Sequence, residues 1–179
     1  MIKVGQTMSA VNDKTITSSR PEWVGNESNT QKYEFFNKVK TPLANGRVNA
    51  ILRVDQPDSD PGTSIQLRKV FFSYYEATPS FFLIAEGEDQ YAGTELWISG
   101  DGLEAGKTYT ISGGLEHVDA WLGIEGVTTD YGTTPQGTFT VISFDAQSIG
   151  GYFRFRFSNI GHGDNREIDF FCTHFVINF

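Results

Sequence analysis

The sequence contains very little cysteine, since Cys172 is the single cysteine among 179 residues. No disulfide can form within the chain, so packing alone has to hold the fold together. Apolar runs are also short. The longest is the five residues from Phe81 to Ala85, far below the roughly 20 residues that a membrane-spanning helix needs. A transmembrane helix is excluded, and the sequence has neither the repeat of a collagen nor that of a coiled coil.

A secretory signal peptide is also missing from the start of the chain. Residues 1–20 do not show a basic start followed by an apolar stretch of about 7–15 residues. We therefore expect a cytoplasmic protein or one exported by a route that needs no such signal, unless a leader has been removed.

Basic residues are scarce in the second half of the chain. Residues 1–90 contain 10 Lys and Arg against 11 Asp and Glu, residues 91–179 contain 4 against 11, and the net charge is −8. Nucleic-acid binding depends on Lys and Arg contacts to phosphates, so this balance argues against nucleic acid and against an anionic membrane as partners. Ca²⁺ or a polycation fits the charge, but a solvated acidic surface explains it more simply.

Sequence motifs of well-known enzyme classes are absent. The chain has no G-x-S-x-G, no Walker loop, no dinucleotide fingerprint and no H-E-x-x-H. Glu86, Glu88 and Asp89 cluster in one expected turn, and paired carboxylates can hydrolyse glycosides. Since no pattern places one of them in an apolar pocket, a carboxylate-based hydrolase is the weakest hypothesis for the function.

The histidines give weak signals for chemistry. Cys172 and His174 are two apart on an expected strand, so we expect them on one face, at about 6–7 Å, too far apart for a nucleophilic pair. His162 and Asp164 could each donate to a metal ion, but further ligands are missing. These residues are expected to have structural roles.

What the sequence does have is aromatic residues and glycine, with 15 Phe, 7 Tyr, 3 Trp and 19 Gly. Short runs with alternating apolar residues lie between turn residues, which is typical of β-strands. In the clearest run, Phe153, Phe155 and Phe157 alternate with Arg154 and Arg156, which predicts an antiparallel strand with one buried face. Strands are expected in the following segments: 47–54, 65–75, 81–85, 95–99, 108–112, 120–124, 137–144, 151–157 and 168–179.

This pattern predicts an all-β protein. We expect a single antiparallel β-sandwich or jelly-roll-like barrel of about eight to ten strands, formed by residues 31–179. Residues 1–30 are expected to form a loosely held N-terminal arm. Residues Tyr33–Lys40 fit a single helical turn and a strand equally well. No period of 20–50 residues repeats, which argues against a solenoid or a propeller.

The second half of the chain resembles small bacterial all-β domains of unknown function, often found on lipoproteins. The segments that carry the resemblance are Gly137–Val141, Ser143–Asp145, Gly150–Phe155, the last strand and, upstream, Gly106–Ile111. The chain departs from such lipoproteins because no lipobox cysteine lies near its start. The resemblance implies a β-sandwich and supplies no catalytic residue.

The loop from Asp55 to Gly62 is the best candidate for a metal site. Asp55, Asp58 and Asp60 supply three carboxylates in a loop that two prolines stiffen, and Ca²⁺ prefers oxygen ligands. The spacing departs from an EF-hand, which has glycine at its sixth position and a distal glutamate. A solvated turn is the alternative interpretation of the same residues.

Tryptophans next to acidic residues suggest a carbohydrate ligand. Trp97 stands between Leu96 and Ile98, so if those two face the core, Trp97 faces outward. An exposed indole can stack on the apolar face of a sugar while neighbouring carboxylates accept hydrogen bonds from its hydroxyls. Trp97, Trp121, Asp101 and Asp119 are the residues we expect to bind a ligand, although burial in an ordinary β core is the competing interpretation for each tryptophan.

The sequence therefore favours a recognition module that binds without catalysis, presenting its loops at one end of the domain. The leading hypothesis is a lectin-like, carbohydrate-binding domain with optional help from Ca²⁺. The alternative is a structural or protein-interaction subunit of a bacterial surface or secreted assembly, which would form an oligomer through its N-terminal arm.

Overall fold

The computed structural model describes residues 44–75, 80–112, 118–125, 134–161 and 164–179. These residues form nine β-strands and one short 3-10 helix. The strands are β1 (Asn45–Val54), β2 (Thr63–Tyr75), β3 (Ser80–Gly87), β4 (Thr94–Asp101), β5 (Thr108–Ile111), β6 (Asp119–Ile124), β7 (Gln136–Phe144), β8 (Ser148–Gly161) and β9 (Asp164–Asn178), and the helix η1 is Asp89–Tyr91.

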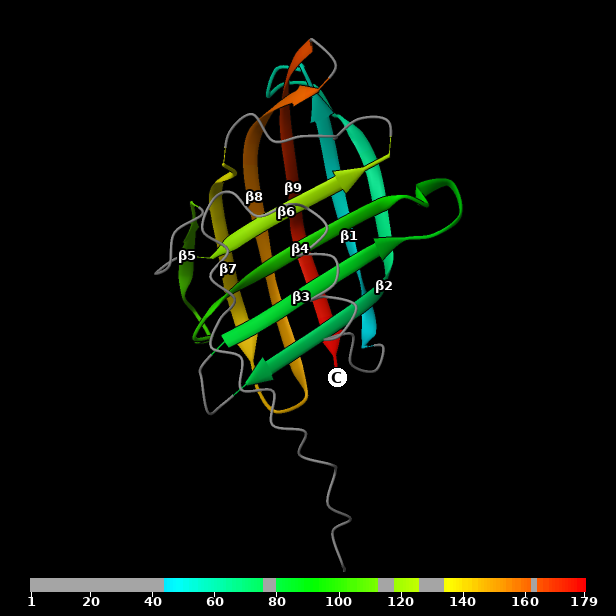
Figure 1. The fold of residues 1–179 in the computed structure, drawn as a ribbon. Coiled ribbons are helices and arrows are strands. Elements are labelled where there is room, and N and C mark those ends of the chain that lie inside the picture. The colour runs from blue at the N-terminus through cyan, green and yellow to red at the C-terminus, as the bar shows by residue number, and fades with distance from the viewer. Residues whose placement is uncertain (1–43, 76–79, 113–117, 126–133, 162–163) are drawn as a thin grey trace, which may run out of the picture.

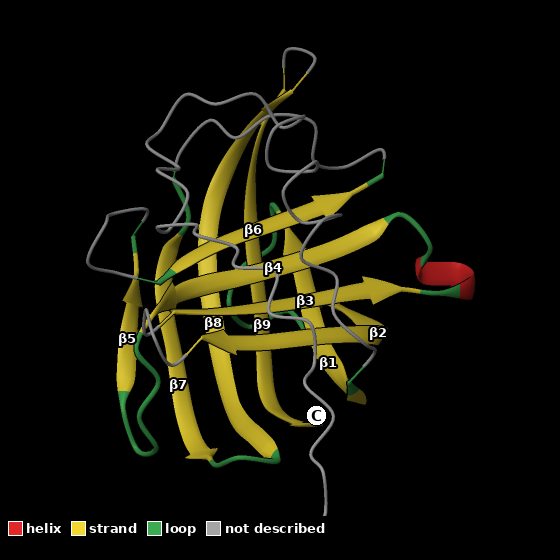
Figure 2. Ribbon diagram, turned by 60° about the horizontal axis from the view of Figure 1, so that its bottom comes forward, coloured by secondary structure: helices red, strands yellow, loops and turns green. Residues whose placement is uncertain are grey.

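All nine strands belong to one antiparallel sheet with the order β5-β7-β8-β9-β1-β2-β3-β4-β6. Among the described residues, one isolated parallel bridge joins the two edges of this sheet, between Ile111 on β5 and Val118, the residue before β6, and there the backbone N–H of Val118 donates to the carbonyl of Thr110 at 3.1 Å. The sheet is therefore a nearly closed barrel. Strands β2, β3, β4 and β6 cross over β7, β8 and β9 at a steep angle, with the core between them (Figures 1 and 2).

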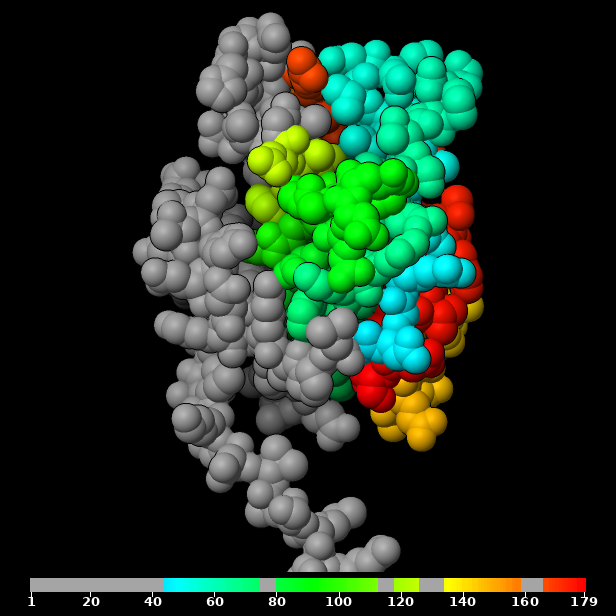
Figure 3. All heavy atoms as spheres, turned by 90° about the vertical axis from the view of Figure 1, so that its right-hand side faces the viewer, coloured from blue at the N-terminus to red at the C-terminus, as the bar shows by residue number. Residues whose placement is uncertain are grey.

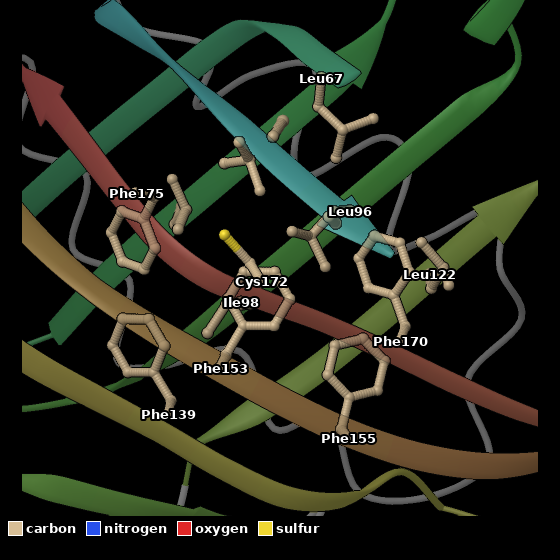
Figure 4. Close-up of a cluster of buried hydrophobic side chains, with 14 of the residues drawn as sticks. Leu67, Leu96, Ile98, Leu122, Phe139, Phe153, Phe155, Phe170, Cys172 and Phe175 are labelled. Carbon is tan, nitrogen blue, oxygen red and sulfur yellow. The ribbon is translucent and has the colours of Figure 1, made fainter. Parts of the chain in front are cut away.

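The barrel interior is filled by the inward-facing side chains of every strand. Phe153 and Phe155 on β8 both contact Phe170 on β9, with ring centroids 5.9 Å apart in a stacked pair and 5.7 Å apart in a tilted pair, respectively. In Figure 4 the phenylalanines of β7, β8 and β9 point toward the aliphatic side chains of β4 and β6, such as Leu96 and Leu122. Aromatic burial on this scale supplies the main driving force for a fold that lacks a disulfide.

The structure confirms the predicted all-β class, and the strand count lies within the predicted range. Each of the nine segments expected to be extended contains a strand, with ends that differ by a few residues. Of the two architectures predicted, one continuous sheet corresponds to the barrel. The predicted N-terminal arm, residues 1–30, and the ambiguous segment Tyr33–Lys40 lie outside the described residues.

Helix is nearly absent from the part of the chain that the structure describes. The acidic turn predicted after β3 contains η1, which has three residues. No helix within the described ranges has the length and apolar character needed to cross a membrane.

Candidate functional site

The four residues predicted to bind a ligand lie on neighbouring strands and point out of the barrel. Trp97 on β4 is directly opposite Trp121 on β6, and two positions along the same ladder Ser99 is opposite Asp119. Asp101 ends β4, two residues beyond Ser99. Residues two apart on a strand share a face, so the strand pairing brings residues from distant parts of the chain onto one outer surface.

The two indoles contact each other on this surface. Their ring centroids are 4.4 Å apart and the ring planes are inclined by 32°. Trp97 is 5% exposed, whereas Trp121 is half-buried. Trp97 thus faces outward from the barrel, as predicted, but its ring is not the solvent-exposed platform that the sequence suggested. Trp121 is the more accessible of the two.

Further apolar side chains on the same face pack around the tryptophans. Phe82 and Ile84 on β3 are buried with Trp97, and Phe71 on β2 is half-buried beside them. We call these residues, together with Trp121, the outer aromatic cluster. Because Phe81, Leu83 and Ala85 fill the barrel interior, every residue from Phe81 to Ala85 is buried. This explains why the longest apolar run of the sequence lies in β3.

A glycine fixes the orientation of the Trp121 ring. A Cβ atom added to Gly123 would lie 2.2 Å from Cη2 and 2.8 Å from Cζ3 of Trp121. The indole therefore lies across the strand where residue 123 has no side chain. Any larger residue at this position would displace the ring.

The three carboxylates of the predicted metal loop have separate partners. Asp55 accepts a hydrogen bond from the backbone N–H of Glu167 at 2.8 Å, and Asp60 accepts one from the N–H of Gly62 at 2.7 Å. Asp58 forms ion pairs with Arg154 and Arg156 on β8. The ion pairs of Asp58 fasten the β1–β2 loop to β8, and the hydrogen bond of Asp55 fastens it to the start of β9, beside which it lies in Figure 3.

The described residues include no group of three or more His, Cys, Asp or Glu side chains placed to hold a metal ion. The cations that Asp58 meets are guanidinium groups. Asp55 instead has a structural role, since its φ of 53° turns the chain out of β1 while its carboxylate and N–H pair with the backbone of Glu167.

Sequence reasoning missed a charged cluster on the outer face of β1, β8 and β9. Asp169 on β9 lies between Arg53 on β1 and Arg156 on β8 in the strand pairing. Arg154 donates to Asp169 twice, from Nε to Oδ1 at 2.8 Å and from Nη2 to Oδ2 at 2.6 Å, and Arg53 donates from Nη1 at 3.1 Å. We call Arg53, Arg154, Arg156, Asp58 and Asp169 the arginine cluster.

The arginines keep Asp169 charged although it is 7% exposed. Burial acts to raise the pKa of Asp169, but hydrogen bonds from Arg154 and Arg156, and the charges of both, lower the pKa below its ordinary value. The ring of Phe171 supports the cluster, with Arg53 Cζ at 4.8 Å and Arg154 Cζ at 5.3 Å from its centroid. The alternation of Arg with Phe along β8 was a signal for outward arginines, but it could not name their partner.

The carboxylates considered for hydrolysis lie around the β3–β4 turn. Glu86 is opposite Glu95 in the β3–β4 ladder, and Asp89 begins η1. Glu88 lies 3.9 Å from the ammonium group of Lys69, and both side chains are well exposed. None of these three carboxylates is buried, so none lies in the apolar pocket that a general acid needs, and the geometry adds nothing to the hydrolase hypothesis.

The expectation that Cys172 and His174 share a strand face was wrong. Cys172 and Phe175 are three positions apart on β9, whereas their partners Phe153 and Gly151 are two positions apart on β8, so β9 contains a bulge with one extra residue. Cys172 therefore points inward and is buried, whereas His174 points outward and is exposed. Burial raises the pKa of the Cys172 thiol to about 11, and its S–H donates to the His174 carbonyl at 3.2 Å. His162 lies outside the described residues.

The described residues form an all-β, nearly closed antiparallel barrel of nine strands, with a packed interior and two chemically different outer faces. Comparison with protein-family models, with curated proteins and with solved structures finds no match to this chain.

Proposed function

We propose that the protein is a non-enzymatic recognition module that binds carbohydrate on the outer face of β4 and β6. The observation that carries the proposal is the arrangement of Trp121, which is half-buried, lies across Gly123 and contacts the ring of Trp97 in a tilted geometry. An indole held flat on a strand offers the apolar surface that the C–H face of a sugar ring requires.

Polar groups beside the indole supply the hydrogen bonding that a sugar needs. Asp119 and Ser99 face the same way two residues from the tryptophan pair, and Asp101 extends the row along β4. Carboxylates accept hydrogen bonds from sugar hydroxyls, and a serine hydroxyl both donates and accepts. Because the barrel interior is filled by its own side chains, the ligand is expected on this outer face.

A glycan array with purified protein tests the proposal, run once with Ca²⁺ and once with a chelator. We expect binding to a defined class of neutral sugars, and a weaker signal for Trp121→Ala by about fivefold, the loss of about 1 kcal/mol of stacking. Tyr152→Ala is the matched control because it removes an exposed aromatic ring from another face of the barrel. An array without signal above background, or equal loss in both variants, would refute carbohydrate binding on β4 and β6.

Exposed apolar residues favour protein interaction as the second candidate function. Ile142 on β7, Tyr152 on β8 and Val176 on β9 are 53%, 41% and 44% exposed and face outward from three neighbouring strands. Gly150 flattens the surface among them, since a Cβ there would lie 2.8 Å from Ser143 Oγ and 3.6 Å from Val176 Cγ2. Exposed apolar groups that gather on one surface are a common feature of interaction sites. Sedimentation of the wild type and of Val176→Asp distinguishes self-association from binding of another protein.

A further inference from the structure

Two arginines of β8 present their guanidinium groups together at the surface. Arg154 and Arg156 are two residues apart, share the outer face and are 44% and 49% exposed. Both contact the same oxygen, Oδ1 of Asp58, and the Arg154 contact is 2.8 Å. Asp58 belongs to the β1–β2 loop and its side chain is 67% exposed.

A more buried layer holds these guanidinium groups in place. Asp169 is only 7% exposed and binds Arg154 through two hydrogen bonds. Arg156 Nε lies 3.3 Å from Oδ1 of Asp169, and Phe171 supports Arg154 from below. Arginines whose orientation is fixed before a ligand arrives lose little conformational entropy on binding it.

We propose that Arg154 and Arg156 form a binding site for a carboxylate group of a ligand, and that Asp58 occupies this site as an internal substitute. Planar guanidinium groups bind carboxylates with defined geometry, and Asp58 shows that this site accepts one. An ion pair as exposed as that of Asp58 contributes little to stability, so an external carboxylate can replace it at small cost.

The local charge favours the exchange. With Asp58 displaced, Arg53, Arg154 and Arg156 face the single buried carboxylate of Asp169, which leaves an excess of two positive charges in a chain of net charge −8. Distant acidic residues are screened beyond a Debye length of about 8 Å at physiological salt. Thr138 and Gln136 on β7 are exposed and lie opposite Arg154 and Arg156, where they can bind the polar remainder of the ligand.

The test titrates the full chain with sodium glucuronate and with N-acetyl-alanine at constant ionic strength, monitoring the arginine Nε–Hε signals by NMR. We expect saturable shifts with a carboxylate probe, about fivefold tighter binding for Asp58→Asn, and loss of binding for Arg156→Gln. Arg68→Gln is the matched control, since Arg68 is an exposed β2 arginine whose guanidinium contacts Gln66 at 2.9 Å. Preference for one probe separates a sugar acid from a peptide carboxylate as the source.

Several results would overturn the inference. The first is that neither the wild type nor folded Asp58→Asn binds a carboxylate probe saturably. The second is that Asp58→Asn binds the probe no more tightly than the wild type. The third is that Arg68→Gln and Arg156→Gln lose equal affinity for the probe. If Arg156→Gln does not fold, the comparison of wild type with Asp58→Asn decides alone. Glucose, which has no carboxylate, should leave the arginine signals unchanged, so failure of this site and failure of neutral sugar binding at Trp121 are distinguishable.

Discussion

The two outer faces of the barrel differ far more than the inner sides of the same strands. On β2, β3, β4 and β6, the outward residues include the outer aromatic cluster, and three of its five members are buried. On β1, β8 and β9, the outward residues include the arginine cluster, in which guanidinium groups surround Asp169. Inside, both halves contribute apolar side chains to one core.

This difference shows that two requirements act on each strand independently. The inward positions have to fill a closed space, so they accept only apolar residues that fit. The outward positions are not restricted by the interior volume. The outer face of β2, β3, β4 and β6 therefore carries aromatic residues, whereas that of β1, β8 and β9 carries charged residues. Recognition chemistry is therefore expected on the outward positions, and stability on the inward ones.

The largest expected change in the free energy of unfolding comes from a substitution that leaves a cavity in the barrel interior. Phe155 is fully buried and its ring contacts those of Phe153 and Phe170, so Phe155→Ala should lower the free energy of unfolding by about 3–5 kcal/mol. Tyr152→Ala, an outward position of the same strand, should change it by no more than about 0.5 kcal/mol. Urea denaturation measures both variants, and similar losses would contradict the separation of inner and outer positions.

The next effect comes from the buried carboxylate of the arginine cluster. Asp169→Asn leaves Arg53 and Arg154 without their shared partner, so the free energy of unfolding should fall by about 3 kcal/mol at pH 7. Since folding lowers the pKa of Asp169, its contribution is fully present above the unfolded-state value of about 3.9 and is lost as pH falls through the lower folded-state pKa. The gap between wild type and variant should therefore shrink in acid, and a gap independent of pH would contradict this role.

A smaller effect is expected where the outer aromatic cluster meets glycine. Gly123→Ala places a methyl group against the Trp121 ring, so the free energy of unfolding should fall by about 1–3 kcal/mol and tryptophan fluorescence should change. Trp121→Phe removes the part of the ring that the methyl group would meet. The double variant should therefore be destabilised less than the sum of the single variants, and strict additivity would show that ring and methyl do not meet.

The smallest expected effect requires no substitution and concerns the reactivity of the Cys172 thiol toward a disulfide reagent. Burial raises the pKa of Cys172 to about 11, so at pH 8 about one thiol in a thousand is ionised, and a disulfide reagent should react only after unfolding. Because the folded-state pKa exceeds the unfolded value of about 8.5, the stability linked to this group is present below pH 8.5 and falls as pH rises toward 11. Rapid labelling of the folded protein at pH 8 would show that β9 opens locally.

Much of the fold could be predicted because strand alternation is a local signal. Phe153, Phe155 and Phe157 alternate with Arg154 and Arg156, and the structure places the first set inside and the second outside. The bulge in β9 could not be predicted, because an extra residue in a strand is defined only by its partner. For this reason the prediction that Cys172 and His174 share one strand face was wrong.

The candidate sites likewise combine features that local sequence predicts with features that depend on distant residues. That Trp97 faces outward follows from its neighbours in the sequence. Its burial and its contact with Trp121 depend on β6, which pairs directly with β4 although β5 lies between the two strands in the sequence. The acidic loop was recognisable as a turn rich in carboxylates. Its partners, Arg154 and Arg156, are about 100 residues away and could not be inferred from it.

The sequence by itself determined the all-β class, the nine strand segments and, where apolar and polar residues alternate as in β8, the inner or outer position of the strand residues, because these depend on the periodicity of each short segment. The tertiary structure decided that the strands form one barrel, that the rings of Trp97 and Trp121 contact each other and that Asp169 is shared by three arginines. Each of these features is a contact between segments far apart in the chain. Such contacts depend on the order and register of the strands, and both are determined when the sheet closes into a barrel.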